Sequence, residues 1–199
     1  MDTVLAGHHL RKTFGGAIAL AGLDFHLRQG EILGLIGPNG AGKTTLINIV
    51  SGHLRASTGD VSLHGQVISS LPAHEIARAG IARTFQTVRP FVGMTVEENV
   101  LVGAFFGAAR RLHEPHPRRR VEEALPFVSL MSRRRDPLDE VTLGDPKKVE
   151  LARALAMEPQ VLLLDELMAG LNPGEMDGTM ALVRQINALG VSLIIVEHV

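Results

Sequence analysis

One stretch of the chain combines glycines with a lysine and a threonine in an order that could bind phosphate. Gly37-Pro38-Asn39-Gly40-Ala41-Gly42-Lys43-Thr44 fits the pattern G-x-x-x-x-G-K-[ST]. Glycines let backbone N–H groups curl around an anion, and the N-terminus of a following helix favours negative charge. Lys43 would neutralise the β- and γ-phosphates, and the Thr44 hydroxyl would hold Mg²⁺. The sequence therefore predicts a nucleoside triphosphate site, to which Thr45 also contributes.

Two acids follow a run of apolar residues later in the chain, in the order Val161-Leu162-Leu163-Leu164-Asp165-Glu166. In an open α/β sheet, ligands bind beyond the carboxyl ends of the strands, so these acids and the phosphate loop can converge on one nucleotide. Asp165 would reach Mg²⁺ through water, and Glu166 would polarise the attacking water. Acids at the end of a strand are often merely solvated, so this prediction depends on the phosphate loop.

The elements that must position these residues can be predicted from apolar patterns. Glu31–Ile36 indicates a buried, parallel strand before the phosphate loop, and Lys43–Val50 a helix after it. Leu23–Leu27 alternates like a half-buried strand before a turn at Gln29-Gly30. Further strands are expected at 59–65, 81–85, 161–164 and 191–196, and helices at 72–80, 146–157 and 174–189. Residues 95–132 are expected to be helical with an interruption at 112–117, and the alternation of strands and helices predicts a parallel sheet.

Composition excludes several classes of protein. The formal net charge is −1 and the basic runs Arg118–Arg120 and Arg133–Arg135 contain no aromatic residues, so nucleic acid is not an expected partner. No apolar run approaches the ~18 residues of a membrane span. The chain has no cysteine, and its first residues do not form a signal peptide. The glycine spacing also differs from G-x-G-x-x-G, which disfavours a Rossmann oxidoreductase.

In this order, the motifs resemble the ATP-binding subunits of ABC transporters over essentially the whole chain. The stretches Arg83-Thr84-Phe85-Gln86, Met94–Val100 and Ala169–Pro173 are most similar to the subunits that serve branched-chain amino acid uptake. The resemblance implies an α/β fold: a P-loop NTPase core with a mostly parallel sheet, an N-terminal antiparallel β subdomain and an inserted α-helical subdomain. It places the core in residues 1–90 and 159–199 and the helical subdomain, with the signature segment, in 91–158.

Three further residues acquire roles only through the resemblance. Gln86 matches the glutamine that senses the γ-phosphate and Mg²⁺, and the residues after it would meet the coupling helix of a membrane subunit. His198 matches the switch histidine that contacts the γ-phosphate. Phe14 lies where the family places an aromatic ring that stacks on adenine, although a core phenylalanine is the alternative.

The segment Thr142-Leu143-Gly144-Asp145-Pro146 occupies the place of the ABC signature but departs from Leu-Ser-Gly-Gly-Gln. Thr142, Gly144 and Asp145 are the predicted nucleotide-binding residues here. We expect Asp145 to cap the following helix and Pro146 to occupy its first turn, although Pro146 removes a backbone N–H near the phosphate. Two more departures are Leu167, where the family usually has proline, and the last residue, Val199, beyond which family members continue.

The resemblance implies ATP and Mg²⁺ as cofactors and a head-to-tail dimer with an identical chain or a paralogue. Permease subunits would hold the dimer at the cytoplasmic face of the membrane, and a solute-binding protein would act indirectly. Alternatives stay open: a truncated nucleotide-binding module with little or no ATPase activity, or an ABC-class ATPase that acts outside transport. A kinase with the same phosphate loop is a weaker alternative, because it would not explain Gln86, Asp145 and His198.

Overall fold

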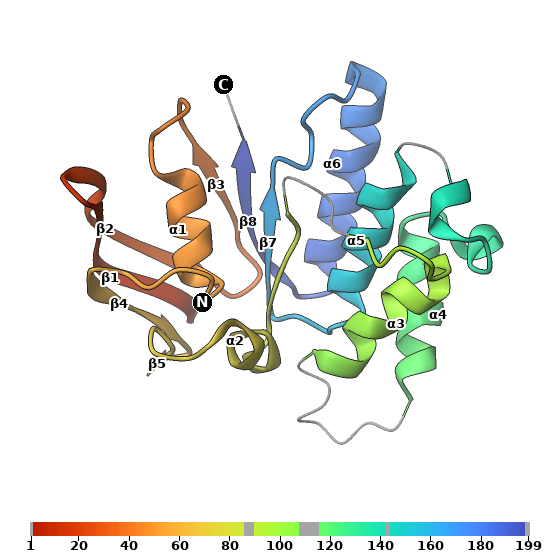
Figure 1. Cartoon of the computed structure of the whole chain (residues 1–199), viewed down its shortest axis with the longest axis horizontal. Coiled ribbons are helices and arrows are strands. Elements are labelled where there is room, and N and C mark those ends of the chain that lie inside the picture. Colours follow the sequence, from red (N-terminus) through yellow and green to blue (C-terminus); the bar gives the residue numbers. More distant parts are fainter. Residues whose placement is uncertain (1, 86–89, 108–115, 142–143, 198–199) are drawn as a thin grey trace.

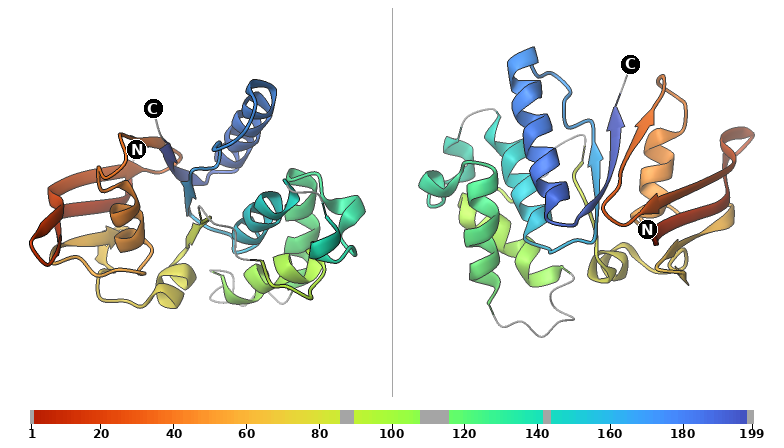
Figure 2. Two further views of the ribbon diagram at one scale, coloured as in Figure 1. Left: turned by 45° about the horizontal axis from the view of Figure 1, so that its top comes forward. Right: turned by 180° about the vertical axis from the view of Figure 1, so that it is seen from behind.

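The structure is a computed structural model that describes residues 2–85, 90–107, 116–141 and 144–197. It contains an antiparallel sheet, a parallel sheet and a group of helices, with the parallel sheet between the other two (Figure 1). Turning the molecule shows that the antiparallel sheet and the helices lie on opposite sides of the parallel sheet (Figure 2). The architecture agrees with the predicted α/β fold and its N-terminal antiparallel β subdomain.

The antiparallel sheet has the order β2-β1-β4-β5. Its strands are β1 (Thr3–Phe14), β2 (Ala17–Arg28), β4 (Thr58–Leu63) and β5 (Gln66–Val67). The sequence indicated only the short strand within β2, whereas β1 and β2 are both 12 residues long. Register shifts on both sides of Leu10 interrupt the alternation of apolar residues, which hides the length of this hairpin in the sequence.

The parallel sheet has the order β3-β8-β7-β6, and the carboxyl ends of its strands share one edge. Its strands are β3 (Ile32–Ile36), β8 (Ser192–Glu197), β7 (Val161–Asp165) and β6 (Ile81–Arg83). The prediction that β3 is buried was wrong. It is parallel to β8 but lies at the edge of the sheet, and one of its faces is uncovered: Ile32 is 39% and Ile36 is 66% exposed.

In the described part of the chain, six α-helices lie between and after the strands, with bounds close to those predicted. They are α1 (Lys43–Val50), α2 (Ala73–Ala79), α3 (Val96–Phe106), α4 (Pro117–Phe127), α5 (Asp145–Leu155) and α6 (Pro173–Ala188). Short 3-10 turns cover Met131–Arg133 and Leu138–Glu140. Capping boxes fix two of the starts: Thr95 with Glu98 begins α3, and Asn172 with Glu175 begins α6.

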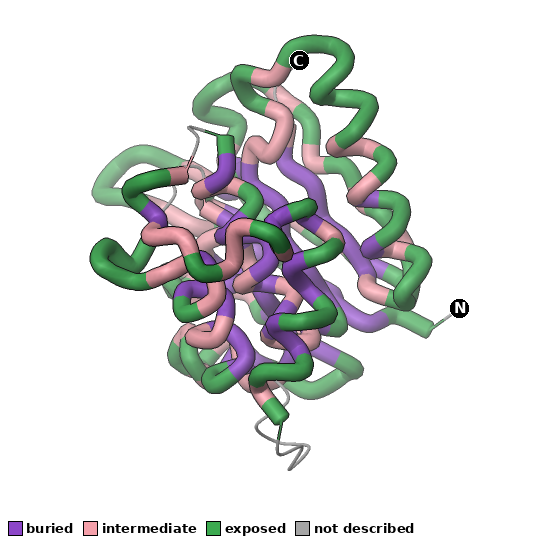
Figure 3. Tube along the Cα trace, turned by 90° about the vertical axis from the view of Figure 1, so that its right-hand side faces the viewer, coloured by how far each residue is buried: buried purple, intermediate pink, exposed green. Residues whose placement is uncertain are grey.

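Two hydrophobic cores cover the two faces of the parallel sheet. Strand β7 is buried along its whole length and shows the division: Val161 and Leu163 point to the core shared with α1 and the antiparallel sheet. Leu162 and Leu164 point to the core shared with the helices. Buried segments therefore run through the middle of the molecule and exposed segments surround them (Figure 3). This double packing fixes the position of Asp165 at the end of β7.

Helices α3, α4 and α5 pack on one another beside the parallel sheet. The division into a core of residues 1–90 and 159–199 and a helical subdomain of residues 91–158 stays a prediction. Across the described residues, no helix combines the length and the apolar character needed to cross a membrane.

Candidate nucleotide-binding site

The phosphate loop connects the carboxyl end of β3 to the start of α1, as the mechanism requires. Its backbone needs glycine at two positions, because Gly40 and Gly42 have φ values of +82° and +86°. A Cβ on Gly42 would also lie 2.4 Å from the carbonyl oxygen of Ala19 on β2. Gly42 is the N-cap residue of α1, so the loop ends at a helix N-terminus.

Lys43 is the first residue of α1, and its side chain folds back over the loop. The residue is buried, with 7% of its surface exposed. Its Nζ donates hydrogen bonds to the carbonyl oxygen of Gly37 and, at 2.9 Å, to that of Pro38. The ammonium group thereby bridges the two residues that open the loop and keeps a positive charge at the bottom of the site.

Glu166 and the phosphate loop line the same hollow of about 390 Å³, together with Ala19 and the start of α1. Seven of the nine predicted loop residues, 39–45, lie in this lining. The structure therefore brings the carboxylate that follows β7 next to the predicted triphosphate site, although the two segments are far apart in the sequence.

Glu166 has an unusual backbone conformation. Its φ is +53°, in the left-handed region that non-glycine residues seldom occupy, and its N–H donates to the carbonyl oxygen of Val196 at 3.0 Å. The following turn is held by Glu197, whose Oε1 accepts a hydrogen bond from the N–H of Met168 at 3.1 Å. Such strain persists only where the surroundings impose it and is concentrated at functional sites. Nothing in the residue type predicts it.

Asp165 is fixed by contacts that the sequence did not reveal. Its side chain is 2% exposed, and Oδ2 lies 2.8 Å from Nη2 of Arg83 at the end of β6. Its backbone N–H donates to Oγ1 of Thr84 at 3.3 Å. The sequence places Arg83 in a family motif but does not predict its contact with Asp165, because that contact depends on the pairing of β6 with β7.

The expectation that Asp145 caps α5 was wrong. Gly144 is the N-cap residue, and the buried Asp145 belongs to the first turn of the helix. Its Oδ2 accepts from Nη1 of Arg133 at 2.8 Å, and its Oδ1 accepts from Nζ of Lys148 at 3.3 Å. The Asp145 carboxylate therefore makes charge-assisted bonds to two cations. Pro146 lies in the first turn, as expected.

The start of α5 also contacts the loop that follows Glu166. Nζ of Lys147 donates to the carbonyl oxygen of Ala169 at 2.9 Å. The predicted signature segment is thereby tied to residues that immediately follow the proposed catalytic carboxylate. Gly144 is exposed at this end of the helix and has a φ of −83°.

The remaining predicted site residues fall into two groups. Phe14, at the end of β1, is 51% exposed, which excludes the alternative of a core phenylalanine. Nζ of Lys12 lies 5.2 Å from the centre of its ring, and the ring lines neither hollow beside the phosphate loop. Gln86, Thr142 and His198 lie outside the described residues.

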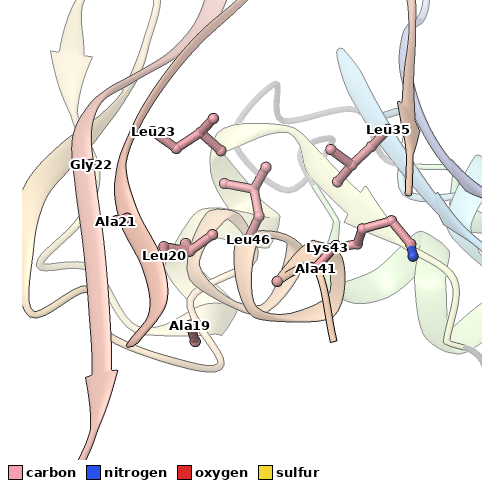
Figure 4. A pocket seen from close by; sticks show the side chains of 10 residues that line it. Ala19, Leu20, Ala21, Gly22, Leu23, Leu35, Ala41, Lys43 and Leu46 are labelled. Atoms are coloured by element: carbon pink, nitrogen blue, oxygen red, sulfur yellow. The ribbon is translucent and has the colours of Figure 1, made fainter. Parts of the chain in front are cut away.

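An apolar hollow of about 400 Å³ adjoins the polar one and shares Ala19, Ala41, Gly42 and Lys43 with it. Leu20 and Leu23 of β2, Leu35 of β3 and Leu46 of α1 surround it (Figure 4). The apolar hollow lies between the edge strands β2 and β3. The phosphate loop is therefore bordered by apolar side chains on one side and by polar groups on the other.

Comparisons with known proteins agree with this geometry. Residues 20–169 match the family model described as ABC transporter. The chain is 36% identical to the high-affinity branched-chain amino acid transport ATP-binding protein LivG of Salmonella typhimurium, over 98% of this chain and 82% of that protein. It is 35% identical to the corresponding protein BraF of Pseudomonas aeruginosa, over 95% of this chain and 79% of that protein.

Solved structures show the same fold. One describes the ADP conformation of an ATP-binding cassette of an ABC transporter and superimposes with a TM-score of 0.88 at 32% identity, covering 100% of this chain and 82% of that one. Another, cbiO1 from Clostridium perfringens, gives a TM-score of 0.86 at 29% identity, covering 100% and 80% of the two chains. The match of the family model over most of the chain and the identity to these relatives show that the chain belongs to the ATP-binding, P-loop ATPase family of ABC transporters.

Proposed function

We propose that this ABC transporter subunit hydrolyses ATP to drive the import of branched-chain or related amino acids. The observation that carries the hydrolytic part is the position of Glu166, in the lining of the hollow that the phosphate loop forms. The solute class and the direction rest on the similarity to LivG and BraF, which are named as branched-chain amino acid transport proteins.

The residues around the loop fit a magnesium nucleotide. Mg²⁺ in such sites is held by one or two protein oxygens together with phosphate oxygens and water. Thr44 is exposed at the start of α1, and Asp165 ends the neighbouring β7. Among the described residues no group of three His, Cys, Asp or Glu side chains could hold a metal alone, so phosphate would complete the site. When bound, Mg²⁺ supplies positive charge at the β- and γ-phosphate oxygens.

The roles of the chain's own residues follow from positioning and charge. The backbone N–H groups of the loop and Lys43 bind the phosphates, and Glu166 orients a water molecule for attack on the γ-phosphate. The left-handed backbone of Glu166 sets the direction in which its side chain leaves the chain, and Glu166 lines the hollow beside the loop. Gln86 remains a proposed contact of the γ-phosphate and Mg²⁺. His198 remains a proposed contact of the γ-phosphate.

A second ATP-binding subunit would complete each site. In this proposal, two copies of the chain, or the chain and a paralogue, form a head-to-tail dimer in which α5 of one faces the ATP of the other. Asp145 is engaged by Arg133, so the contact with nucleotide falls on Thr142, Gly144 and the remaining N–H groups at the start of α5. Hydrolysis removes the γ-phosphate contacts and reopens the dimer.

A groove beside α3 suits the membrane subunits. It has a volume of about 470 Å³ and lies between α2, the end of β6, α3 and α5, with Phe85, Phe91 and Phe106 in its walls. Arg153 lies 5.1 Å from the ring of Phe91, and burial lowers the pKa of its guanidinium against the opposing effect of Glu150. A helix of a permease docked here would reach residues directly before Gln86. It would hold the chain at the cytoplasmic face of the membrane, while the permease and a solute-binding protein select the solute.

The substitution Glu166→Gln tests the hydrolytic role. It removes the charge that orients water but preserves the size of the side chain, so ATP should still bind and turnover should fall by at least about 10²-fold. Binding of a fluorescent ATP analogue and release of phosphate are measured on the same preparation, with the exposed Glu122→Gln of α4 as a matched control. Normal turnover in Glu166→Gln would reject the assignment.

Uptake measurements in the source organism test the transport role. Cells that carry only the Glu166→Gln form should lose accumulation of labelled leucine, isoleucine or valine, whereas cells with Glu122→Gln should retain it. Unchanged uptake, together with loss of turnover in vitro, would favour an ABC-class ATPase that acts outside amino acid import. Binding of ATP without turnover in the wild-type chain would favour a nucleotide-binding module.

A further inference from the structure

Arg83 is the most constrained cation near the site, and none of the proposed steps uses it. Its side chain is 8% exposed and its guanidinium makes contacts in three directions. Nη2 bonds to Oδ2 of Asp165 at 2.8 Å, and Nη1 bonds to Oδ1 of Asn48 at 2.6 Å and approaches Oγ of Ser51 at 3.3 Å. The ring of Phe85 lies 4.7 Å from its Cζ.

These contacts join three segments that carry parts of the site. Asn48 belongs to α1, whose first residues Lys43 and Thr44 are part of the phosphate loop. Asp165 ends β7, and Phe85 directly precedes Gln86 in the sequence. A rigid fork with donors on two arms can hold a carboxylate and an amide at a fixed separation, which a lysine ammonium on a flexible stem cannot.

The geometry at Asp165 gives this fork a specific consequence. Arg83 engages Oδ2, and within the described part of the chain Oδ1 accepts no hydrogen bond. A carboxylate with one oxygen anchored has a fixed plane, so the direction of its second oxygen is fixed as well. Second partners of this kind commonly orient the oxygen that faces a metal ion or a metal-bound water.

We propose that Arg83 is a positioning residue for the metal ion: it anchors Oδ2 of Asp165 to helix α1 and so aims the other carboxylate oxygen at the Mg²⁺ of the bound nucleotide. The inference rests on the proposed function, since it assigns the metal side of the same site. It predicts that loss of the fork weakens metal binding at the nucleotide while the nucleotide itself still binds without metal.

The test measures metal affinity directly, with Mn²⁺ as the probe. Mn²⁺ is titrated into the full chain saturated with ADP, and free Mn²⁺ is followed by electron paramagnetic resonance, with ADP alone as the blank. Arg83→Lys keeps the charge but loses the two-armed geometry, so it should weaken Mn²⁺ binding by about 10-fold or more. Asn48→Ala removes one hydrogen-bond acceptor of Arg83 and should also weaken Mn²⁺ binding, but by less than Arg83→Lys does. ADP affinity in the presence of EDTA should not change.

Arg120→Lys is the matched control. Arg120 is also buried, pairs with Glu158 at 3.0 Å and lies on α4, away from the nucleotide-binding residues. Its substitution should lower the melting temperature and leave Mn²⁺ affinity unchanged. If Arg83→Lys and Asn48→Ala likewise lower only the melting temperature, Arg83 is a structural ion pair and the inference is overturned. If the wild-type chain binds no more Mn²⁺ than ADP alone, the proposed magnesium nucleotide site itself fails.

Discussion

The end of β7 and the start of α5 each carry a buried aspartate held by an arginine at 2.8 Å, but the two pairs are built differently. Arg83 of β6 contacts Asp165 of the neighbouring strand β7, and it also donates a hydrogen bond to Asn48 of α1. Arg133 reaches Asp145 within a short stretch of chain and also bonds to Asp136 at 3.0 Å and to the carbonyl oxygen of Glu140 at 3.2 Å. The first pair therefore exists only in the assembled tertiary structure, and the second is largely local.

Glycines show the same difference between the two regions. Gly42 has a φ of +86° and no room for a Cβ, whereas Gly144 has a φ of −83° and, among the described residues, no atom within 4 Å of a Cβ. The phosphate loop is thus fixed in detail by its own chain. The start of α5 is left open on the side where the proposed second subunit would approach, so its final environment would come from another chain.

The largest effect on stability is expected from Asp165→Ala. It leaves the guanidinium of Arg83 buried without its counter-ion, which should reduce the free energy of unfolding by about 3–5 kcal/mol. Asp145→Ala should reduce it by about 1 kcal/mol, because Arg133 keeps Asp136 and access to water. Urea unfolding of the two variants gives the comparison. Equal losses would contradict the distinction between a tertiary and a local pair.

Gly42→Ala should have the next largest effect. The left-handed backbone alone should cost about 1–3 kcal/mol, and the contact of the new Cβ with Ala19 displaces the loop and weakens ATP binding. Gly144→Ala should change stability by no more than about 0.5 kcal/mol. Denaturation and nucleotide titration are measured for both, and a loop that tolerates alanine at 42 would show that its geometry is less constrained than described.

The smallest effect is expected at the capping box of α3, in the helical region. Hydrogen bonds from the N–H and then the hydroxyl of Thr95 lower the pKa of Glu98 below its ordinary value of 4.5. A lowered folded-state pKa means that the stabilisation is present above pH 4.5 and is lost as pH falls through the folded-state value. The melting temperatures of wild type and Glu98→Gln should therefore differ slightly at pH 7 and converge in more acidic buffer. A difference that persists unchanged there would contradict this origin.

Local patterns were sufficient for much of the fold. The phosphate loop and α1 could be predicted because their residue types and spacing serve one local geometry, and α1 begins and ends at the predicted residues. The length of β1 and β2 could not, because shifts in register break their alternation. The exposure of β3 also escaped prediction, since an apolar strand looks the same in sequence whether it is central or at an edge.

The candidate site could be predicted as a set of residues but not as an arrangement. Lys43, Asp165 and Glu166 were found from their positions at strand and helix ends. Arg83 was not, because an arginine at the end of a short strand is usually exposed to solvent, and only the pairing of β6 with β7 shows its contact with Asp165. The cap predicted at Asp145 failed for a different reason: α5 begins at Asp145 itself, so Gly144 occupies the N-cap position.

The folded-back side chain of Lys43 affects what a nucleotide titration reports. Its ammonium already donates hydrogen bonds to two loop carbonyl oxygens. A phosphate that binds to the ammonium therefore replaces these bonds. The measured affinity for nucleotide then reflects the difference in free energy between Lys43 bonded to the loop carbonyls and Lys43 bonded to phosphate. Replacing this lysine would loosen the empty loop as well as weaken the filled one, and the measured change would understate the strength of the bond between the lysine and the phosphate.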